Sequence, residues 1–317
     1  MESPWPAGRV VFLMGPTASG KSSLAIKLSE HIPIEIISVD STLVYRGAKI
    51  GAARPSGSML RRVPHHLIGI CGPSSFYSVA KFCEDASRKI DEIQARGKLP
   101  VLVGGTGMYF RALENGLHDL PDRDEAVRRE LDIICETYGS SRLHRMLTEL
   151  DPESARRIDE SDSHRLIRAI EVFRVTGDTM TSLMAKAHKK TSEISPVKFI
   201  LASRNREALA SAIAKRFDGM LEKGLVNEVN ELRWNASVVR DNPLLGSVGY
   251  KQVGDYLMDK ISYTEMKQQA IVATCQLAKR QRTWFRREID AIWCDSESVQ
   301  SDLGVMVKLI CGDIQYR

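Results

Sequence analysis

The sequence lacks a hydrophobic run of the roughly 20 residues that a membrane-spanning helix requires. Its first residues, 1–5, are acidic and have no apolar stretch of the kind that a secretory signal contains. Its six cysteines lie far apart, without the paired spacing of a zinc site or a disulfide framework. We therefore expect a cytoplasmic protein with reduced cysteines and no membrane partner.

The sequence also lacks internal repeats, low-complexity tracts and long apolar heptads, so we expect a monomer. Hydrophobic residues make up 43% of the 317 residues and charged residues 27%, which is typical of a globular protein. This length allows one large domain or two. Composition alone therefore excludes disordered and fibrous classes but selects no function.

The net charge of +5 is modest, yet the positive residues are concentrated in three places, 128–129, 186–190 and 279–287. The last segment places five cations around Trp284 and Phe285. Such a run is either a solvated helix face or a surface for nucleic acid, on which bases stack against aromatic rings. Both interpretations stay open on charge alone.

Residues 15–22 read GPTASGKS and fit the phosphate-binding pattern G-x-x-x-x-G-K-[ST]. An apolar run at 10–14 predicts a strand before them, and the spacing from Ser22 predicts a helix after them. The backbone N–H groups of such a loop surround an anion, while Lys21 reaches outer phosphate oxygens and the Ser22 hydroxyl holds Mg²⁺. The residues predicted to bind a di- or triphosphate are Gly15, Pro16, Thr17, Ala18, Ser19, Gly20, Lys21 and Ser22, with Ser22 also the predicted magnesium ligand.

Two further apolar runs, 34–39 and 99–103, predict strands of the same parallel sheet. Asp40 follows the first, at the rim where open α/β sheets bind ligands, and would hold Mg²⁺ through water or act as a base. A glycine-rich segment, 104–107, follows the second. It forms a tight turn or places Thr106 against a ligand, and the sequence does not choose between these.

The paired histidines His65 and His66 suggest a metal site, but adjacent side chains diverge on a strand or a helix. No third ligand accompanies them at a zinc spacing. We therefore predict that they form hydrogen bonds.

The pattern changes at about residue 118, where charged helical periodicity replaces strand-like runs. A strand returns at 197–202, followed by a helix from about Arg206 and a long helix over 265–288. Arg216 lies between apolar neighbours, so its side chain either covers them or points into a site. The predicted fold is α/β, a P-loop core with a parallel sheet over 1–117 and 193–317, interrupted by a helical domain over 118–192.

Seven motifs in order, from about residue 9 to 290, resemble the tRNA dimethylallyltransferase family. They lie at 15–22, 40–47, 64–67, 104–109, 165–171, 248–252 and 278–284. The chain departs from the usual family pattern at Leu43, Gly69, His164 and the pair 246–247, which alters details of tRNA contact. The sequence shows no zinc finger after the last predicted strand, so we expect the bacterial type of the family.

The resemblance implies transfer of a dimethylallyl group from dimethylallyl diphosphate to the exocyclic N6 amine of the adenosine 3′-adjacent to the tRNA anticodon. It implies Mg²⁺ as the cofactor and Asp40 as the base. Thr17 and Arg216 are implied as further contacts to the leaving diphosphate. Backbone amides, Lys21 and a metal ion are suited to the charge of such a leaving group.

The resemblance also implies binding of the tRNA anticodon stem-loop, whose target adenine must leave its stack to reach a buried site. Basic residues would contact phosphates, and unstacked bases would carry specificity. The implied tRNA-binding residues are Asp40, Ser41, Thr42, Leu43, Thr106, Arg128, His164, Arg165, Leu166, Ile167, Arg168, Gly246, Ser247, Val248, Gly249, Tyr250 and Lys251.

Other classes remain as alternatives. The phosphate loop alone favours an ATP-dependent kinase of a small molecule, although the basic helical segments have no role in such an enzyme. A nucleotide-gated nucleic-acid-binding protein is a third hypothesis. A GTPase is disfavoured because the sequence has no Asn-Lys-x-Asp motif. Whether ATP or GTP also binds the loop is left open.

Overall fold

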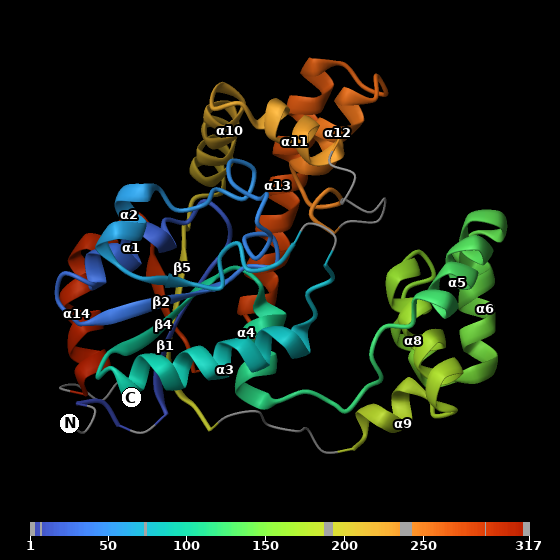
Figure 1. Ribbon diagram of the computed structural model, residues 1–317, viewed down its shortest axis with the longest axis horizontal. Helices are drawn as coiled ribbons and strands as arrows, with labels where there is room; N and C mark the ends of the chain where they lie inside the picture. Colours follow the sequence, from blue (N-terminus) through green and yellow to red (C-terminus); the bar gives the residue numbers. More distant parts are fainter. Residues whose placement is uncertain are drawn as a thin grey trace. The chain divides into compact units, whose positions relative to one another are not determined.

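The computed structural model describes residues 4–6, 8–72, 75–186, 193–234, 243–288 and 290–312. The chain divides into two compact units, which are described separately (Figure 1). Unit 1 comprises Met1–Glu114 with Thr191–Arg317, and unit 2 is Asn115–Lys190. The sequence placed the inserted helical domain at 118–192. Within the described residues, no helix is long and apolar enough to cross a membrane.

Unit 1 is built on a six-stranded sheet in the order β3-β2-β4-β1-β5-β6, in which every pair of neighbours is parallel. The prediction of an α/β core with a parallel sheet is confirmed. The strands are β1 (Arg9–Met14), β2 (Ile34–Val39), β3 (His65–His66), β4 (Leu99–Gly104), β5 (Ser195–Ala202) and β6 (Ile292–Asp295).

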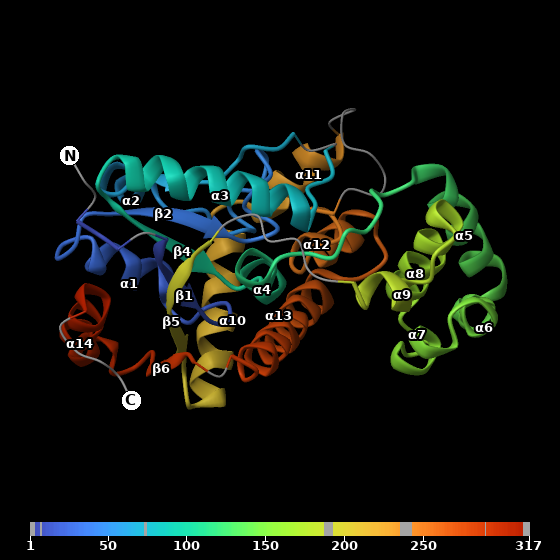
Figure 2. The same cartoon turned by 90° about the horizontal axis from the view of Figure 1, so that it is seen from below.

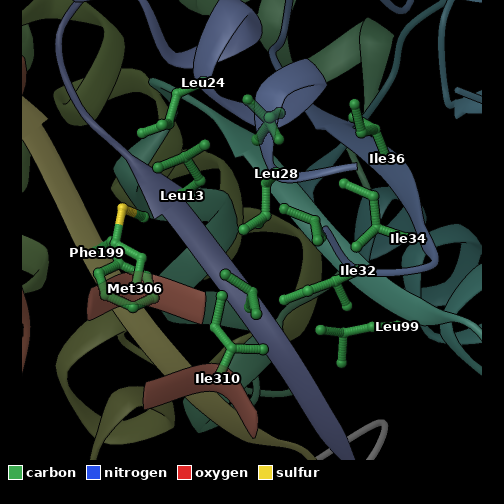
Figure 3. Packing of buried hydrophobic residues seen from close by; sticks show 14 of the residues in the cluster. Leu13, Leu24, Leu28, Ile32, Ile34, Ile36, Leu99, Phe199, Met306 and Ile310 are labelled. Carbon is green, nitrogen blue, oxygen red and sulfur yellow. The ribbon is translucent and has the colours of Figure 1, made fainter. Parts of the chain in front are cut away.

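Both faces of this sheet are covered, which explains why β1, β2 and β4 are almost continuously apolar. Val11 and Leu13 of β1 pack on one face with α1 (Lys21–Leu28) and α14 (Val299–Cys311), in the cluster shown in Figure 3. Phe12 points to the other face, where its ring lies 5.0 Å from that of Phe110 in α4 (Gly107–Asn115). Figure 2 shows these helices on opposite sides of the strands.

The remaining helices of unit 1 either cover the sheet or extend beyond the ends of its strands. Phe82 of α3 stacks on Tyr109 of α4, with ring centroids 4.3 Å apart, so α3 covers the same face as α4. The segment 246–252 is helical from Tyr250 onward. These helices are α2 (Gly57–Arg62), α3 (Val79–Ala95), α10 (Arg206–Glu222), α11 (Leu225–Trp234), α12 (Tyr250–Leu257) and α13 (Tyr263–Phe285).

Unit 2 contains α5 (Glu125–Tyr138), α6 (Ser140–Leu150), α7 (Pro152–Arg157), α8 (Ser163–Thr176) and α9 (Met180–Met184). Its described residues include no strand. Leucines at helical spacing, among them Leu131, Leu143 and Leu166, form its core. The buried Glu171 of α8 accepts hydrogen bonds from two arginine side chains and from the backbone N–H of Asp124. It therefore holds the residues just before α5 against this core.

A buried carboxylate near the beginning of β2 joins three segments of unit 1. Glu35 is 3% exposed and accepts two hydrogen bonds from Arg96, at 3.1 and 2.7 Å. His66 lies 2.7 Å and Lys98 3.2 Å from its oxygens. Burial alone would raise the pKa of Glu35, but the hydrogen bonds from Arg96, His66 and Lys98 lower it to about 2. The predicted hydrogen bonding of the paired histidines is confirmed, since His65 also bonds the carbonyl of Val63.

We expect Glu35→Gln to lower the free energy of unfolding by about 3 kcal/mol at neutral pH, because it leaves cations without a charged partner. The folded-state pKa lies below the ordinary value of 4.5, so the carboxylate stabilises the fold above that pH and loses its effect as pH falls toward 2. The difference between wild type and variant in urea unfolding should therefore shrink below about pH 4.5.

The exposed Glu84 in α3, which pairs with Lys81, provides the control. Glu84→Gln should change the free energy of unfolding by less than about 0.5 kcal/mol. An equal effect of the two substitutions, or a difference that does not depend on pH, would contradict a stabilising role for the buried carboxylate.

Candidate active site

The phosphate loop occupies the turn between β1 and α1. Gly20 has a φ of 87° and caps the helix, and Gly15 has a φ of 152°. A Cβ atom on Gly15 would lie 2.2 Å from the carbonyl oxygen of Leu201, so only glycine fits there. The loop and the N-terminus of α1 therefore have the backbone conformation that would present N–H groups to an anion.

Lys21 is folded back onto this loop. Its Nζ donates hydrogen bonds to the carbonyl of Pro16, at 2.6 Å, and to Oγ of Ser19, at 3.3 Å. Burial lowers the pKa of Lys21 from 10.5 to about 7; Asp40 raises it in part, and Arg216 lowers it further. The ammonium group thus lacks a full counter-charge, which an anionic ligand would supply.

Asp40 follows β2 directly, at the edge where the parallel strands end. Its Oδ1 accepts hydrogen bonds from the backbone N–H groups of Thr42 and Leu43, at 2.8 and 3.1 Å. Its Oδ2 makes no hydrogen bond to any described residue. Thr106, after β4, accepts from the amide of Ser41 at 3.3 Å, so its hydroxyl supports this segment. One oxygen of Asp40 is therefore fixed and the other is available for chemistry.

Thr17 and Ala18 of the phosphate loop and Asp40 line a cavity of about 330 Å³ in unit 1. Arg216 of α10 lies in its wall, and NH1 of Arg216 donates to Oγ1 of Thr17 at 3.4 Å, so this side chain faces the site. Much of the remaining wall is apolar. The polar side chains include Thr17, Asp40, Ser41, Thr42, Arg216, Ser247, Thr274 and Gln281, and the apolar ones Ala18, Ala52, Ile213, Phe217, Met220, Leu225, Val248 and Leu277.

Gln281 of α13 is a site residue that the sequence analysis missed. Its Oε1 accepts from the backbone N–H of Thr17 at 2.9 Å, and its Nε2 donates to the carbonyl of Gly105 at 3.1 Å. A Cβ on Gly105 would lie 2.3 Å from that Nε2, and one on Gly107 would lie 2.1 Å from the ring of Trp284. Gly105 and Gly107 thus admit α13. The charge of the segment 279–287 does not single out Gln281, whose partner Thr17 is 264 residues away in the chain.

The segment before α12 forms another part of the cavity wall. Residues 246–249 line the cavity, as expected for a site segment. Tyr250 is 1% exposed, with its hydroxyl bonded to Glu228, whereas Lys251 is exposed. The side chain of Tyr250 therefore supports the wall from behind and does not form its surface.

The predicted tRNA-binding residues of unit 2 have different environments. Leu166 and Ile167 are buried in the core of the unit, whereas His164 and Arg165 are exposed. Arg128 donates two hydrogen bonds to Glu171, at 2.9 and 3.1 Å. Arg168 donates to Glu171 at 2.8 Å and to the carbonyl of Pro121 at 2.7 Å. The two arginines are thus held by a buried carboxylate and are only partly exposed.

The donor atoms near the loop suit a magnesium ion that arrives with its ligand. Ser22 is exposed, and its hydroxyl has no hydrogen-bond partner among the described residues. No group of three or more His, Cys, Asp or Glu side chains in those residues forms a metal cage. Mg²⁺ commonly takes one or two protein oxygens, with substrate phosphates and waters completing its shell. A serine hydroxyl beside a phosphate loop fits that requirement.

The sheet and its phosphate loop define a P-loop α/β protein with a helical insertion. Residues 43–288 match the family model described as IPP transferase, and the chain belongs to this transferase family. The resemblance noted in the motifs is thereby confirmed.

Relatives and solved structures agree with this assignment. The tRNA dimethylallyltransferases of two Coxiella burnetii strains, Dugway 5J108-111 and RSA 493 / Nine Mile phase I, are each 45% identical over 288 residues, covering 91% of this chain and 93% of theirs. The tRNA isopentenylpyrophosphate transferase of Bacillus halodurans is 35% identical, with a TM-score of 0.70 and 96% of each chain covered. A eukaryotic dimethylallyltransferase solved acting on tRNA, with a TM-score of 0.77 over 96% of this chain and 80% of its own, is 24% identical and supports the fold alone.

The lowered pKa of Lys21 predicts proton uptake when an anion binds. Above about pH 7 the free lysine is largely neutral, and a bound anion favours its charged form. At pH 8, calorimetry of inorganic diphosphate binding in buffers of different ionisation heat should show the wild type taking up roughly one more proton than Lys21→Arg, which stays charged. Equal uptake by the two proteins would contradict a neutral Lys21.

The two hydrogen bonds of Gln281 predict a role in shaping the phosphate loop. We expect Gln281→Leu to weaken inorganic diphosphate binding about tenfold, because the loss of two hydrogen bonds frees Thr17 and Gly105. Gln276→Leu, on an exposed position of the same helix, is the matched control and should bind normally. Similar affinity of both variants would show that the loop holds its shape without Gln281.

Proposed function

We propose that this protein transfers a dimethylallyl group from dimethylallyl diphosphate to the exocyclic N6 amine of the adenosine 3′-adjacent to a tRNA anticodon. The observation that carries the proposal is the cavity of about 330 Å³ that combines a phosphate loop, an available carboxylate oxygen and an apolar wall. The 45% identical relatives are tRNA dimethylallyltransferases, which supports the same reaction. We further infer that the protein acts as a monomer in the cytoplasm.

The phosphate loop is suited to the diphosphate end of the donor. In the proposed complex, loop amides, Lys21, and Arg216 with its partner Thr17 would surround the place where negative charge develops. As the bond between the allylic carbon and oxygen breaks, its electron pair leaves with the diphosphate, whose charge then increases. Groups fixed in advance around that charge stabilise the transition state more than the ground state.

Asp40 is suited to accept the proton that the amine loses. The nitrogen lone pair forms the new bond to the allylic carbon, and one N–H proton passes to Oδ2 of Asp40. Because Oδ1 is held by two backbone amides, the carboxylate is oriented before the substrates arrive. This order of events leaves a neutral secondary amine and free diphosphate as the products.

The apolar wall suits the hydrocarbon part of the donor. Ile213 and Phe217 of α10 are buried beside the cavity, and Met220 and Leu277 also line it. Burying the dimethylallyl group there removes apolar surface from water. It also limits the access of water, which would otherwise compete with the amine for the allylic carbon.

Magnesium is proposed as the metal that accompanies the diphosphate. The hydroxyl of Ser22 would contribute one ligand, with phosphate oxygens and waters supplying the others. When bound, the ion would neutralise charge on the leaving group. Lys21 and the loop amides would then hold the remaining oxygens in place.

Exposed cations on α13 suit the phosphates of the tRNA. Lys279, Arg280, Arg286 and Arg287 lie at or near the end of this helix and are exposed. We propose that they bind the anticodon stem-loop together with Lys251, His164 and Arg165. Arg128 and Arg168 would contribute chiefly by fixing the structure of unit 2, since Glu171 already binds both. Binding should weaken as salt concentration rises.

The reaction is tested by incubating the purified protein with Mg²⁺, dimethylallyl diphosphate and unmodified tRNA, and then analysing nucleosides by mass spectrometry. An adenosine that gains one C5 isoprenyl group is the expected product. Asp40→Ala should lower kcat by about 10² to 10⁴ while leaving tRNA affinity largely intact. Asp91→Ala, at an exposed position of α3, should behave like the wild type.

Two outcomes would contradict these roles. ATP hydrolysis or phosphoryl transfer without prenylation would favour the kinase hypothesis. A parallel loss of tRNA binding in Asp40→Ala would show that Asp40 contributes to folding or binding and not to proton transfer.

A further inference from the structure

The carboxylate of Glu228 in α11 is 9% exposed, and its partners are N–H and O–H groups. Its Oε2 accepts from the backbone N–H of Ile50 at 2.7 Å. Its Oε1 lies 3.4 Å from the N–H of Lys49, 3.1 Å from that of Gly51 and 2.7 Å from the hydroxyl of Tyr250. One side chain thus binds three consecutive backbone amides and a buried tyrosine.

The groups that Glu228 binds support two separate parts of the cavity wall. Gly51 and Ala52 line the cavity on one side, and residues 246–249, which lead directly into Tyr250, line it elsewhere. The two parts are in direct contact behind the wall, because a Cβ on Gly51 would lie 2.5 Å from the ring of Tyr250. Glu228 therefore bridges segments that are about 200 residues apart in the chain.

A purely stabilising role does not explain the choice of a carboxylate at this position. Burying this carboxylate without a cation among its described partners costs desolvation energy, which the hydrogen bonds from three amides and a hydroxyl offset. A carboxylate differs from an apolar side chain in fixing the direction of several N–H groups at once. Burial and then Glu228 raise the pKa of Tyr250, so its hydroxyl stays protonated and remains a donor.

We propose that Glu228 is a positioning residue that fixes residues 49–51 against Tyr250 and thereby sets the shape of the donor cavity. Its effect on catalysis rests on the transfer reaction proposed above, whereas its hold on residues 49–51 does not. Glu228 lies outside the set of residues that line the cavity, so it acts through the backbone that it binds.

The test compares full-length Glu228→Gln, Tyr250→Phe and the double variant with wild type in the prenylation assay. In Glu228→Gln an NH₂ group replaces one oxygen and faces an N–H donor, so at least one hydrogen bond is lost. We expect the KM for dimethylallyl diphosphate to rise about tenfold or more. The Kd for tRNA should change less than about twofold, because its contacts extend beyond the cavity. The double variant should be no worse than Glu228→Gln, since both residues belong to one network.

Glu231→Gln, on the exposed face of the same helix, is the matched control and should keep wild-type kinetics. Hydrogen exchange of residues 49–51 gives a readout that needs no substrate. Exchange should accelerate in Glu228→Gln and stay at the wild-type rate in Glu231→Gln.

Each outcome decides the proposal. An unchanged KM for the donor, or a fall in kcat that the loss of folded protein accounts for, would overturn it. If the wild type itself transfers no prenyl group, the proposed function fails. Hydrogen exchange then still decides whether Glu228 holds the segment, because unchanged exchange in Glu228→Gln would refute that too.

Discussion

The parallel pairing of β1 with β4 on one side and β5 on the other is the constraint on which the site depends. Parallel strands end at the same edge, so the phosphate loop, Asp40 and Thr106 come together although they are distant in sequence. Apolar side chains on both faces of β1 fix this pairing, because a shift by one residue would exchange the two faces. The packing of the core therefore also determines where the residues of the candidate site lie.

Side chains of α11 and α13 hold the backbone at other parts of the site. Gln281 holds Thr17 and Gly105, and Glu228 holds residues 49–51, in each case through main-chain groups. Helices α13 and α12 approach closely where glycine removes a side chain, at Gly105 for Gln281 and at Gly51 for Tyr250. The helices beyond the sheet thus set the geometry of loops that the sheet alone leaves unsupported.

The sequence predicted those parts of the site whose signal is local. The phosphate loop follows from a short motif between a strand and a helix, and Asp40 from its place after a buried strand. Gln281 and Glu228 have no such signal, because their partners lie 264 and about 178 residues away and periodicity does not reveal a contact. Arg128 and Arg168 show a second limit of the sequence. Both were expected to face tRNA, but both bind the buried Glu171, and composition does not reveal which charges pair inside the fold.

The charges around the phosphate loop favour a diphosphate over a neutral ligand. Asp40 is the one carboxylate among the described residues that line the cavity with Arg216. Burial and Arg216 both disfavour the charged form of Lys21, and Asp40 offsets them in part. In the proposed reaction, a diphosphate donor would supply the missing counter-charge, and the charge of the diphosphate would grow as its bond to the allylic carbon breaks. The attraction would then be stronger at the transition state than with the bound donor, which is the condition for binding energy to accelerate a reaction. A site with these charges accelerates most strongly the reaction of a substrate whose leaving group becomes more anionic as its bond breaks.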